Sequence, residues 1–252
     1  MNTAIIVALI SAIVSLVAAG VAYLSQRAIA HLNSEIAEQS RQRTKLELAD
    51  EVMARYRDPL LAAVFDLQSR LYGFVALEFM RRYYIDGDES AREYAIENSL
   101  YIFGEYFAWV EIIRKEIQFL DLGEQAANEK WVRALNAVRD VFAGHKFDQA
   151  IHVFRGEQRA IGELMMVPLA KEMSGRQHES LGYAAFVLKR RDEEFARWFR
   201  KLEGHLKLLA AEPGAHLDRV IHLQHALVDV LDILDADCVR FPRNLRSKLP
   251  LA

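Results

Sequence analysis

The hydrophobic pattern of the chain begins with an apolar run that starts at Ala4 and ends at Leu24, with no charged residue before Arg27. A helix of this length rises about 31 Å, which matches the roughly 30 Å hydrocarbon core of a bilayer. The two serines inside the run can return their hydroxyls to helix carbonyls, so no polar group need be left without a partner in lipid. The run predicts a transmembrane anchor over residues 1–26, with the lipid bilayer as its partner.

Two other interpretations of the run stay open. A cleaved signal peptide has basic residues before a shorter apolar core, whereas only the α-amino charge precedes this run, although Ala18, Ala19 and Gly20 offer a small-residue cleavage site. A buried helix of a soluble core is the other interpretation. It conflicts with the absence of a polar face.

The charges that flank the run indicate its orientation. Arg27, Arg41, Arg43 and Lys45 follow it, and no Lys or Arg precedes it. The positive-inside rule therefore places the C-terminal side in the cytoplasm. The single cysteine, Cys238, cannot form an internal disulfide, which agrees with that compartment. The sequence predicts a single-pass protein of the cell membrane, with the bulk of the chain cytoplasmic.

After the anchor, helical spacing continues through Ile29, Leu32 and Ile36, and residues 37–45 are then polar all round. Such a stretch buries no face, so we expect a solvated juxtamembrane stalk helix over residues 27–57. Polar residues interrupt the heptad seam, and a homodimer through the stalk stays open. The pair Asp58 and Pro59 is expected to end this helix and start the next, because the residue before proline avoids helical geometry.

The rest of the chain shows helical periodicity separated by Gly and Pro. It predicts helices over residues 59–84, 91–120, 129–143, 157–167, 192–209 and 217–237. The helix over 91–120 is apolar on nearly every side and is expected at the centre, with Ser90 and Glu93 as its capping box. Residues 181–188 are short enough for a strand or a buried helix. Because no second strand candidate is evident, a helix or irregular core segment is favoured.

The fold class that follows is all-α: a transmembrane helix continuing into a stalk, then a multi-helix bundle over residues 58–239 and a basic tail over residues 240–252. The tail could lie on anionic lipid or remain a frayed terminus. A net charge of −3 argues against an electrostatic nucleic-acid binder.

A polar row on the last predicted helix is the first candidate site. Asp218, His222, His225, Asp229 and Asp232 are spaced 4, 3, 4 and 3, which places them within roughly an 80° arc of one helix face. His222, His225, Asp229 and Asp232 are the candidate ligands of a divalent transition metal. The alternative is a solvated face of His and Asp pairs without a cofactor, which the missing Glu-x-x-His and Cys-x-x-Cys signatures favour.

A second candidate lies at residues 154–163. Arg155, Glu157, Arg159 and Glu163 could line a polar pocket in which an arginine binds an anionic ligand. Alternatively, the glutamates neutralise the arginines and the glycines of this stretch admit a closely packed neighbour.

Aromatic residues on the central helix form a third candidate, a cage for a cation, although aromatics on such a helix are mostly core. They are Tyr101, Phe103, Tyr106, Phe107 and Trp109. Three glutamates of the same helix, Glu97, Glu105 and Glu111, must be paired if they are buried, and arginines 70, 81 and 114 are the expected partners.

These observations favour a membrane-anchored cytoplasmic module that works by binding an unknown protein partner rather than by catalysis. A tether restricts such a module to partners in the membrane plane. The alternative is a metal-dependent enzyme that uses the polar row of residues 222–232. Convergence of that row with Glu157 or Glu163 in one pocket would favour the enzyme.

Overall fold

The computed structural model describes residues 3–116, 125–147, 150–169 and 176–251. The described chain is mostly helical, which confirms the all-α class. It divides into two compact units, Met1–Asp50 and Glu51–Ala252. The helix α1, Thr3–Ala76, contributes residues to both.

The first unit is helical throughout its described residues, and one of its stretches, Ile13–Thr44, is long and apolar enough to cross a membrane. None of the side chains described in that stretch is buried within the protein; Leu16, for example, is 73% exposed. The Ser15 hydroxyl donates to the carbonyl of Ser11 at 2.8 Å. In lipid a polar group must find its hydrogen-bond partner within the protein, and this bond provides one. Residues 37–44 are exposed on every side, as the polar pattern predicts.

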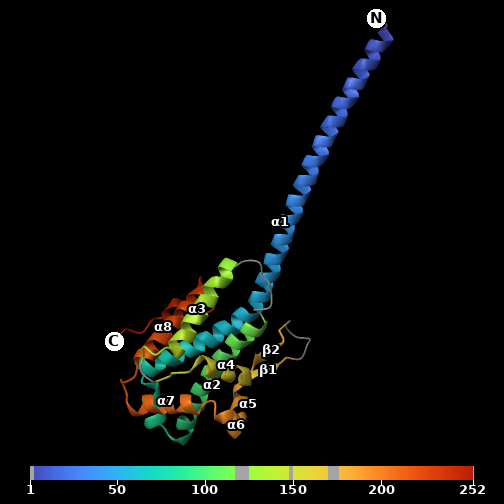
Figure 1. Ribbon diagram of the computed structural model, residues 1–252. Helices are drawn as coiled ribbons and strands as arrows, with labels where there is room; N and C mark the ends of the chain where they lie inside the picture. The colour runs from blue at the N-terminus through green and yellow to red at the C-terminus, as the bar shows by residue number, and fades with distance from the viewer. Residues whose placement is uncertain (1–2, 117–124, 148–149, 170–175, 252) are drawn as a thin grey trace. The chain divides into compact units, whose positions relative to one another are not determined.

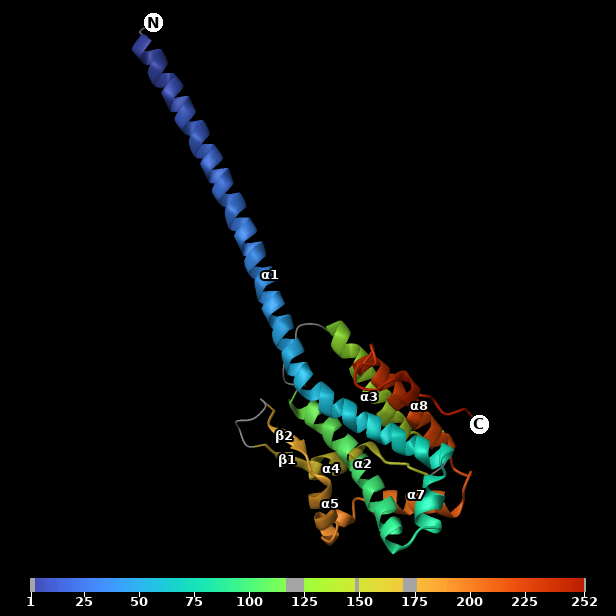
Figure 2. The same cartoon turned by 180° about the vertical axis from the view of Figure 1, so that it is seen from behind.

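The second unit contains the end of α1 and the remaining elements. In chain order these are η1 (Arg81–Ile85, a π-helix), α2 (Glu89–Glu116), α3 (Gln125–Ala143), α4 (Arg155–Met165), β1 (Met166–Pro168), β2 (His178–Ser180), α5 (Tyr183–Lys189), α6 (Glu193–Ala196), α7 (Arg200–Ala211), α8 (Asp218–Leu234) and η2 (Arg243–Leu245, a 3-10 helix). Figure 1 and Figure 2 show α3 and α8 side by side in both views.

The core of this unit is built around α2, as the all-round apolar pattern predicts. Half of its residues are buried, and α4 packs along it. The last turns of α1 lie against both α2 and α8, since Arg70 bonds Asn98 at 2.5 Å and Gln68 bonds Gln224 at 3.2 Å. Leu60 of α1 is 0% exposed. The central helix α2 therefore contacts both α1 and α4.

The prediction that Asp58 and Pro59 separate two helices is wrong, because α1 continues through Pro59 to Ala76. A proline inside a helix costs about 3 kcal/mol, mainly through one lost hydrogen bond. Leu60 and Leu61 are at most 2% exposed, and burying each stabilises the folded state by about 2 kcal/mol. Burial on the far side of the proline therefore outweighs its local cost.

The sequence pattern also misses a small sheet. Strands β1 and β2 pair antiparallel, with Met166 opposite Ser180 and Pro168 opposite His178. Three-residue strands are too short to show alternation, so the hydrophobic pattern selects neither of them. Residues 181–188 fall mostly in the helix α5, as favoured.

Helix boundaries also differ from prediction, since the helix expected over residues 59–84 ends at Ala76 and the π-helix η1 follows it at Arg81–Ile85. The amide of Ala91 receives its cap from the Asp88 carboxylate at 2.8 Å, and α2 begins at Glu89, so the proposed capping box at Ser90 is not the cap. The single helix expected over residues 192–209 is two, α6 and α7, although Asp192 caps the first by accepting from the Glu194 amide at 3.0 Å.

Candidate functional site

The four charged residues of the α4 polar row (Arg155, Glu157, Arg159 and Glu163) bind side chains on three other helices. Arg155 pairs with Asp140 of α3 at 2.6 Å, and Glu157 with Lys201 of α7 at 3.0 Å. On α2, Lys115 lies 3.4 Å from Glu163, and Glu111 lies 4.0 Å from Arg159. The contacts diverge from α4 instead of converging on one pocket.

A close approach between α4 and α2 explains one glycine of this stretch. A Cβ on Gly162 would lie 2.5 Å from the carbonyl oxygen of Phe107 and 2.9 Å from the Cβ of Glu111. The carboxylate of Glu111, whose side chain is 3% exposed, binds Arg114 in bidentate fashion at 2.8 and 2.5 Å. The predicted pairing of Glu111 with Arg114 is present. The α4 polar row therefore lies over a close contact between α4 and α2, where Arg114 neutralises the buried charge of Glu111.

The α8 polar row (Asp218, His222, His225, Asp229 and Asp232) behaves differently. Three of its side chains bind one stretch of chain, the C-terminal segment (residues 240–251). His225 donates from Nε2 to the Leu249 carbonyl at 2.6 Å, Asp229 pairs with Lys248 at 2.6 Å, and Asp232 lies 3.4 Å from Arg246. His222 donates from Nδ1 to the Asp218 carbonyl of its own helix at 2.8 Å.

The C-terminal segment is anchored by a buried ion pair. The Arg246 side chain is 2% exposed and binds the Asp235 carboxylate, and it also donates to the Asp235 carbonyl at 2.9 Å. Burial by itself would raise the pKa of Asp235, but hydrogen bonds from the amides of Phe241, Arg240 and Val239, together with Arg246, lower it below its ordinary value. The carboxylate is therefore charged and fully bonded at neutral pH.

Two buried glutamines, which the sequence analysis did not select, bind the main chain of the segment. Gln224 is 0% exposed; its Nε2 donates to the Ser247 carbonyl at 3.0 Å, and its Oε1 accepts from the Leu249 amide at 3.1 Å. Gln68 is 2% exposed and donates to the Leu245 carbonyl at 3.1 Å. The basic tail is thus an ordered element of the second unit.

Among the described residues, no group of three His, Cys, Asp or Glu side chains is arranged to hold a metal ion. The histidines that approach one another are His145 and His152, with ring centroids 5.7 Å apart, and His222 and His225, 6.5 Å apart. The candidate ligands of the α8 polar row therefore do not converge with one another in this arrangement, nor with Glu157 or Glu163, which bind lysines of α7 and α2.

One further histidine, His205 of α7, lies in a strongly positive environment. Burial, followed by the positive charges of Lys201, His152 and Arg219, lowers its pKa to about 4. Its Nδ1 is buried without a hydrogen-bond partner within the described residues. His205 is therefore neutral at physiological pH.

A buried carboxylate at the end of α2 joins segments far apart in sequence. Glu116, whose side chain is 6% exposed, accepts from the Tyr56 hydroxyl, from His178 Nδ1 at 2.8 Å and from the Gln177 amide at 3.1 Å. Burial and the bond to Glu116 raise the pKa of Tyr56. These bonds attach the β1–β2 pair to α1 and α2. No sequence signal marks this group, since Tyr56 lies 60 positions before Glu116 and Gln177 and His178 lie 61 and 62 positions after it.

Of the five candidate aromatic residues of α2, Phe103, Tyr106, Phe107 and Trp109 are buried and Tyr101 packs partly buried against the core. The rings of Phe103 and Phe107 pack edge to face on Phe142, with centroids 6.1 and 5.0 Å from it. Glu97 pairs with Arg190 at 3.2 Å and Glu105 accepts from the Tyr101 hydroxyl at 3.2 Å, so neither uses the arginine expected from the sequence.

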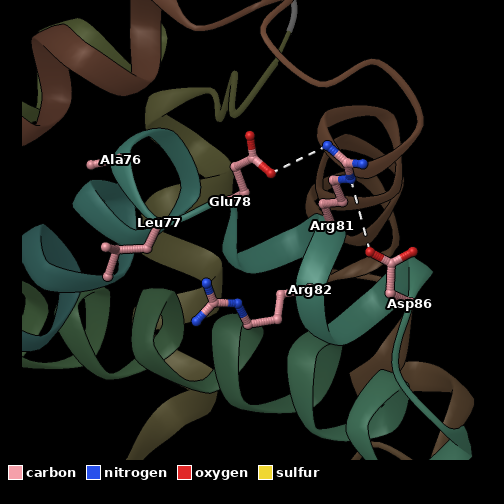
Figure 3. A pocket seen from close by; sticks show the side chains of 6 residues that line it. All are labelled: Ala76, Leu77, Glu78, Arg81, Arg82 and Asp86. Carbon is pink, nitrogen blue, oxygen red and sulfur yellow. Dashed lines mark hydrogen bonds and ion pairs between the residues drawn. The ribbon is translucent and has the colours of Figure 1, made fainter.

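An open pocket of about 470 Å³ lies between the end of α1 and η1. It is lined by Ala76, Leu77, Glu78, Arg81, Arg82 and Asp86. Figure 3 shows Arg81 bound on both sides, to Glu78 at 3.4 Å and to Asp86 at 3.8 Å, while Arg82 points away toward the side of Leu77. Two cations and two carboxylates leave this pocket without net charge.

Comparison with protein-family models, curated proteins and solved structures finds no match.

Proposed function

We propose that the protein is a membrane-anchored helical interaction module whose second unit faces the cytoplasm and binds another protein. The observation that supports the anchor is the helix Ile13–Thr44, which contains a span apolar and long enough to cross a bilayer, and that span is not buried within the protein. Apolar side chains on an isolated helix are stabilised when lipid replaces water around them.

The contacts of the candidate residues support binding over catalysis. Each charged residue of the α4 polar row is paired with an oppositely charged side chain of another helix. In the α8 polar row, His225, Asp229 and Asp232 all bind the C-terminal segment. These groups act in recognition between chain segments. The metal-dependent enzyme is the alternative from the sequence, and no contact of the four candidate ligands favours it.

The proposed orientation can be tested with reporter fusions after Leu251. We expect a fluorescent reporter that folds in the cytoplasm to be bright and an alkaline phosphatase fusion to be inactive, because the basic residues follow the apolar run. The matched control replaces Arg27, Arg41 and Arg43 by Gln and adds three lysines after Met1. That variant should reverse the result. Active phosphatase on the native sequence would contradict the cytoplasmic location.

The interaction role can be tested by crosslinking in intact cells followed by purification in mild detergent. We expect a stoichiometric protein partner with the full chain. The control fuses residues 1–50 to an unrelated soluble domain, so that it keeps the anchor and loses the second unit. A partner recovered equally with both chains would show that the anchor, and not the helical unit, makes the interaction.

A further inference from the structure

The C-terminal segment is held largely through its main chain. The two buried glutamines contact main-chain atoms of Leu245, Ser247 and Leu249, which are alternate residues, and His225 adds a bond to the Leu249 carbonyl. Main-chain carbonyls and amides are the same in every polypeptide. The surface therefore recognises a peptide chain as such, which neither a lipid headgroup nor a metal ion would satisfy.

Side chains at the intervening positions add charge selectivity. Arg246 contacts Asp232 and Asp235, and Lys248 contacts Asp229. Leu249, at 3% exposure, supplies a buried apolar anchor. Residues 246–249 thus present a cation, a residue whose side chain is not used, a second cation and a leucine. They lie on a surface with three carboxylates, those of Asp229, Asp232 and Asp235.

The two ends of this contact differ in how firmly they are held. Arg246 and Asp235 are both buried, so their ion pair is shielded from water. At the other end the Lys248 side chain is 41% exposed and that of Asp229 is 58% exposed, and Leu251 is 64% exposed. Residues 247–251 form neither helix nor strand. The ion pair at Arg246 is thus shielded from water and the one at Lys248 is open to it, so residues 247–249 are held mainly by their main-chain bonds and by the burial of Leu249.

We propose that the segment-binding surface, formed by Gln224, His225 and Asp229, is a docking site for an extended segment of a partner protein with a Lys-Leu pair, and that residues 247–249 of the chain occupy it as a resident competitor. This inference rests on the proposed function as an interaction module and names the surface and the kind of partner. When residues 247–249 leave the surface, the amide of Gln224 loses its bonds to Ser247 and Leu249, and the main chain of an incoming peptide can make the same two bonds.

The test uses the full chain in detergent and a fluorescein-labelled peptide with the sequence of residues 244–251. The release variant is Leu249→Asp, which removes the apolar anchor and leaves Arg246 in place. We expect this variant to bind the peptide at least tenfold more tightly than the native chain does, measured by fluorescence anisotropy. A peptide in which both cations are replaced by Glu should bind at least tenfold more weakly.

Variants of the surface provide the matched controls. Adding Gln224→Leu or Asp229→Lys to the release variant should lower peptide affinity at least tenfold, whereas His222→Gln, whose bond stays within α8, should leave it unchanged. If Leu249→Asp fails to unfold cooperatively, Lys248→Glu replaces it, because that side chain is partly exposed and only one ion pair is lost.

Three outcomes would overturn the proposal. A folded release variant that does not bind the peptide, or equal binding by the native chain, would show that residues 247–249 are a fixed part of the fold. Equal binding of the charge-reversed peptide would remove the stated partner chemistry. A native dimer that becomes monomeric in the release variant would make a second copy the occupant. If a partner still crosslinks to the second unit while the peptide fails to bind, this inference fails and the proposed function stands.

Discussion

The α4 and α8 polar rows look alike in sequence, since each places acidic and basic or imidazole groups at short helical spacing, yet the fold uses them differently. The charges of α4 diverge to α2, α3 and α7, and two of these four pairs have both side chains exposed. The side chains at three positions of α8 converge on one stretch of chain that is itself partly buried. Divergent pairs connect elements of a bundle, whereas convergent pairs define a binding surface.

The difference arises from what lies over each helix. Gly162 lets α4 approach the backbone of α2 closely, and the charged side chains of α4 contact residues of three different helices. On α8, the glutamine at position 224 is buried beneath the C-terminal segment and binds its main chain. Whether a polar row becomes a site therefore depends on the chain that covers it, and not on the composition of the row.

The largest expected effect separates the buried anchor from an exposed pair of the same chemistry. Arg246→Met leaves the Asp235 carboxylate buried without its cation and should lower the free energy of unfolding by about 3–5 kcal/mol. Arg155→Met breaks a pair whose side chains are 61% and 54% exposed and should change it by less than about 1 kcal/mol. Chemical denaturation of the full chain in detergent measures both. Equal losses would remove the contrast between the rows.

A second pair of variants tests whether close packing, not charge, holds α4. Gly162→Ala forces the helices apart at the Phe107 carbonyl and should destabilise the second unit by about 2–3 kcal/mol. Gly204→Ala is the control, because its added Cβ meets nothing within 4 Å. In the interior of α7 it should stabilise by about 0.5–1 kcal/mol. A neutral Gly162→Ala would show that the interhelical charges keep α4 in place.

Much of this fold follows from periodicity, and the failures have physical causes. The apolar pattern predicts α2 as the central helix and the exposed stretch of residues 37–44. It cannot predict that α1 continues through Pro59, because burial of leucines from the same helix decides that outcome. Three-residue strands such as β1 leave no detectable period.

The candidate site was visible in part. The α8 polar row is evident from its spacing, but its partners lie on a segment brought back by the fold, and spacing along one helix does not report them. A signal for Gln224 does exist. It lies three residues before Leu227 and four before Val228, so it occupies the apolar face of its helix. A glutamine at such a position predicts a buried amide that needs a main-chain partner.

Acidification tests His205 of α7, whose pKa is lowered by burial and by nearby cations that include Lys201, the partner of Glu157 on α4. The folded pKa of His205 is about 4, below the ordinary 6.5, so the unfolded chain binds the proton first as the pH falls. Stability should therefore decline between about pH 7 and pH 4. The full shift corresponds to roughly 3 kcal/mol, and solvent screening reduces it to about 1–2 kcal/mol. Melting temperatures of His205→Leu at pH 7.5 and 5.0 should differ less than those of the native chain, whereas His145→Gln, an exposed control, should behave as native.

The smallest effect compares two histidines of one helix face. His225 donates to the Leu249 carbonyl, so His225→Ala should destabilise by about 1 kcal/mol, the typical net contribution of one hydrogen bond. His222 is exposed and donates within its own helix, so His222→Ala should stay within about 0.5 kcal/mol. Repeating both substitutions in the Leu249→Asp background removes the covering segment, and the two histidines should then become equivalent. A difference that persists there would mean that His225 acts on α8 itself, and the convergence that distinguishes α8 from α4 would lose one of its three contacts.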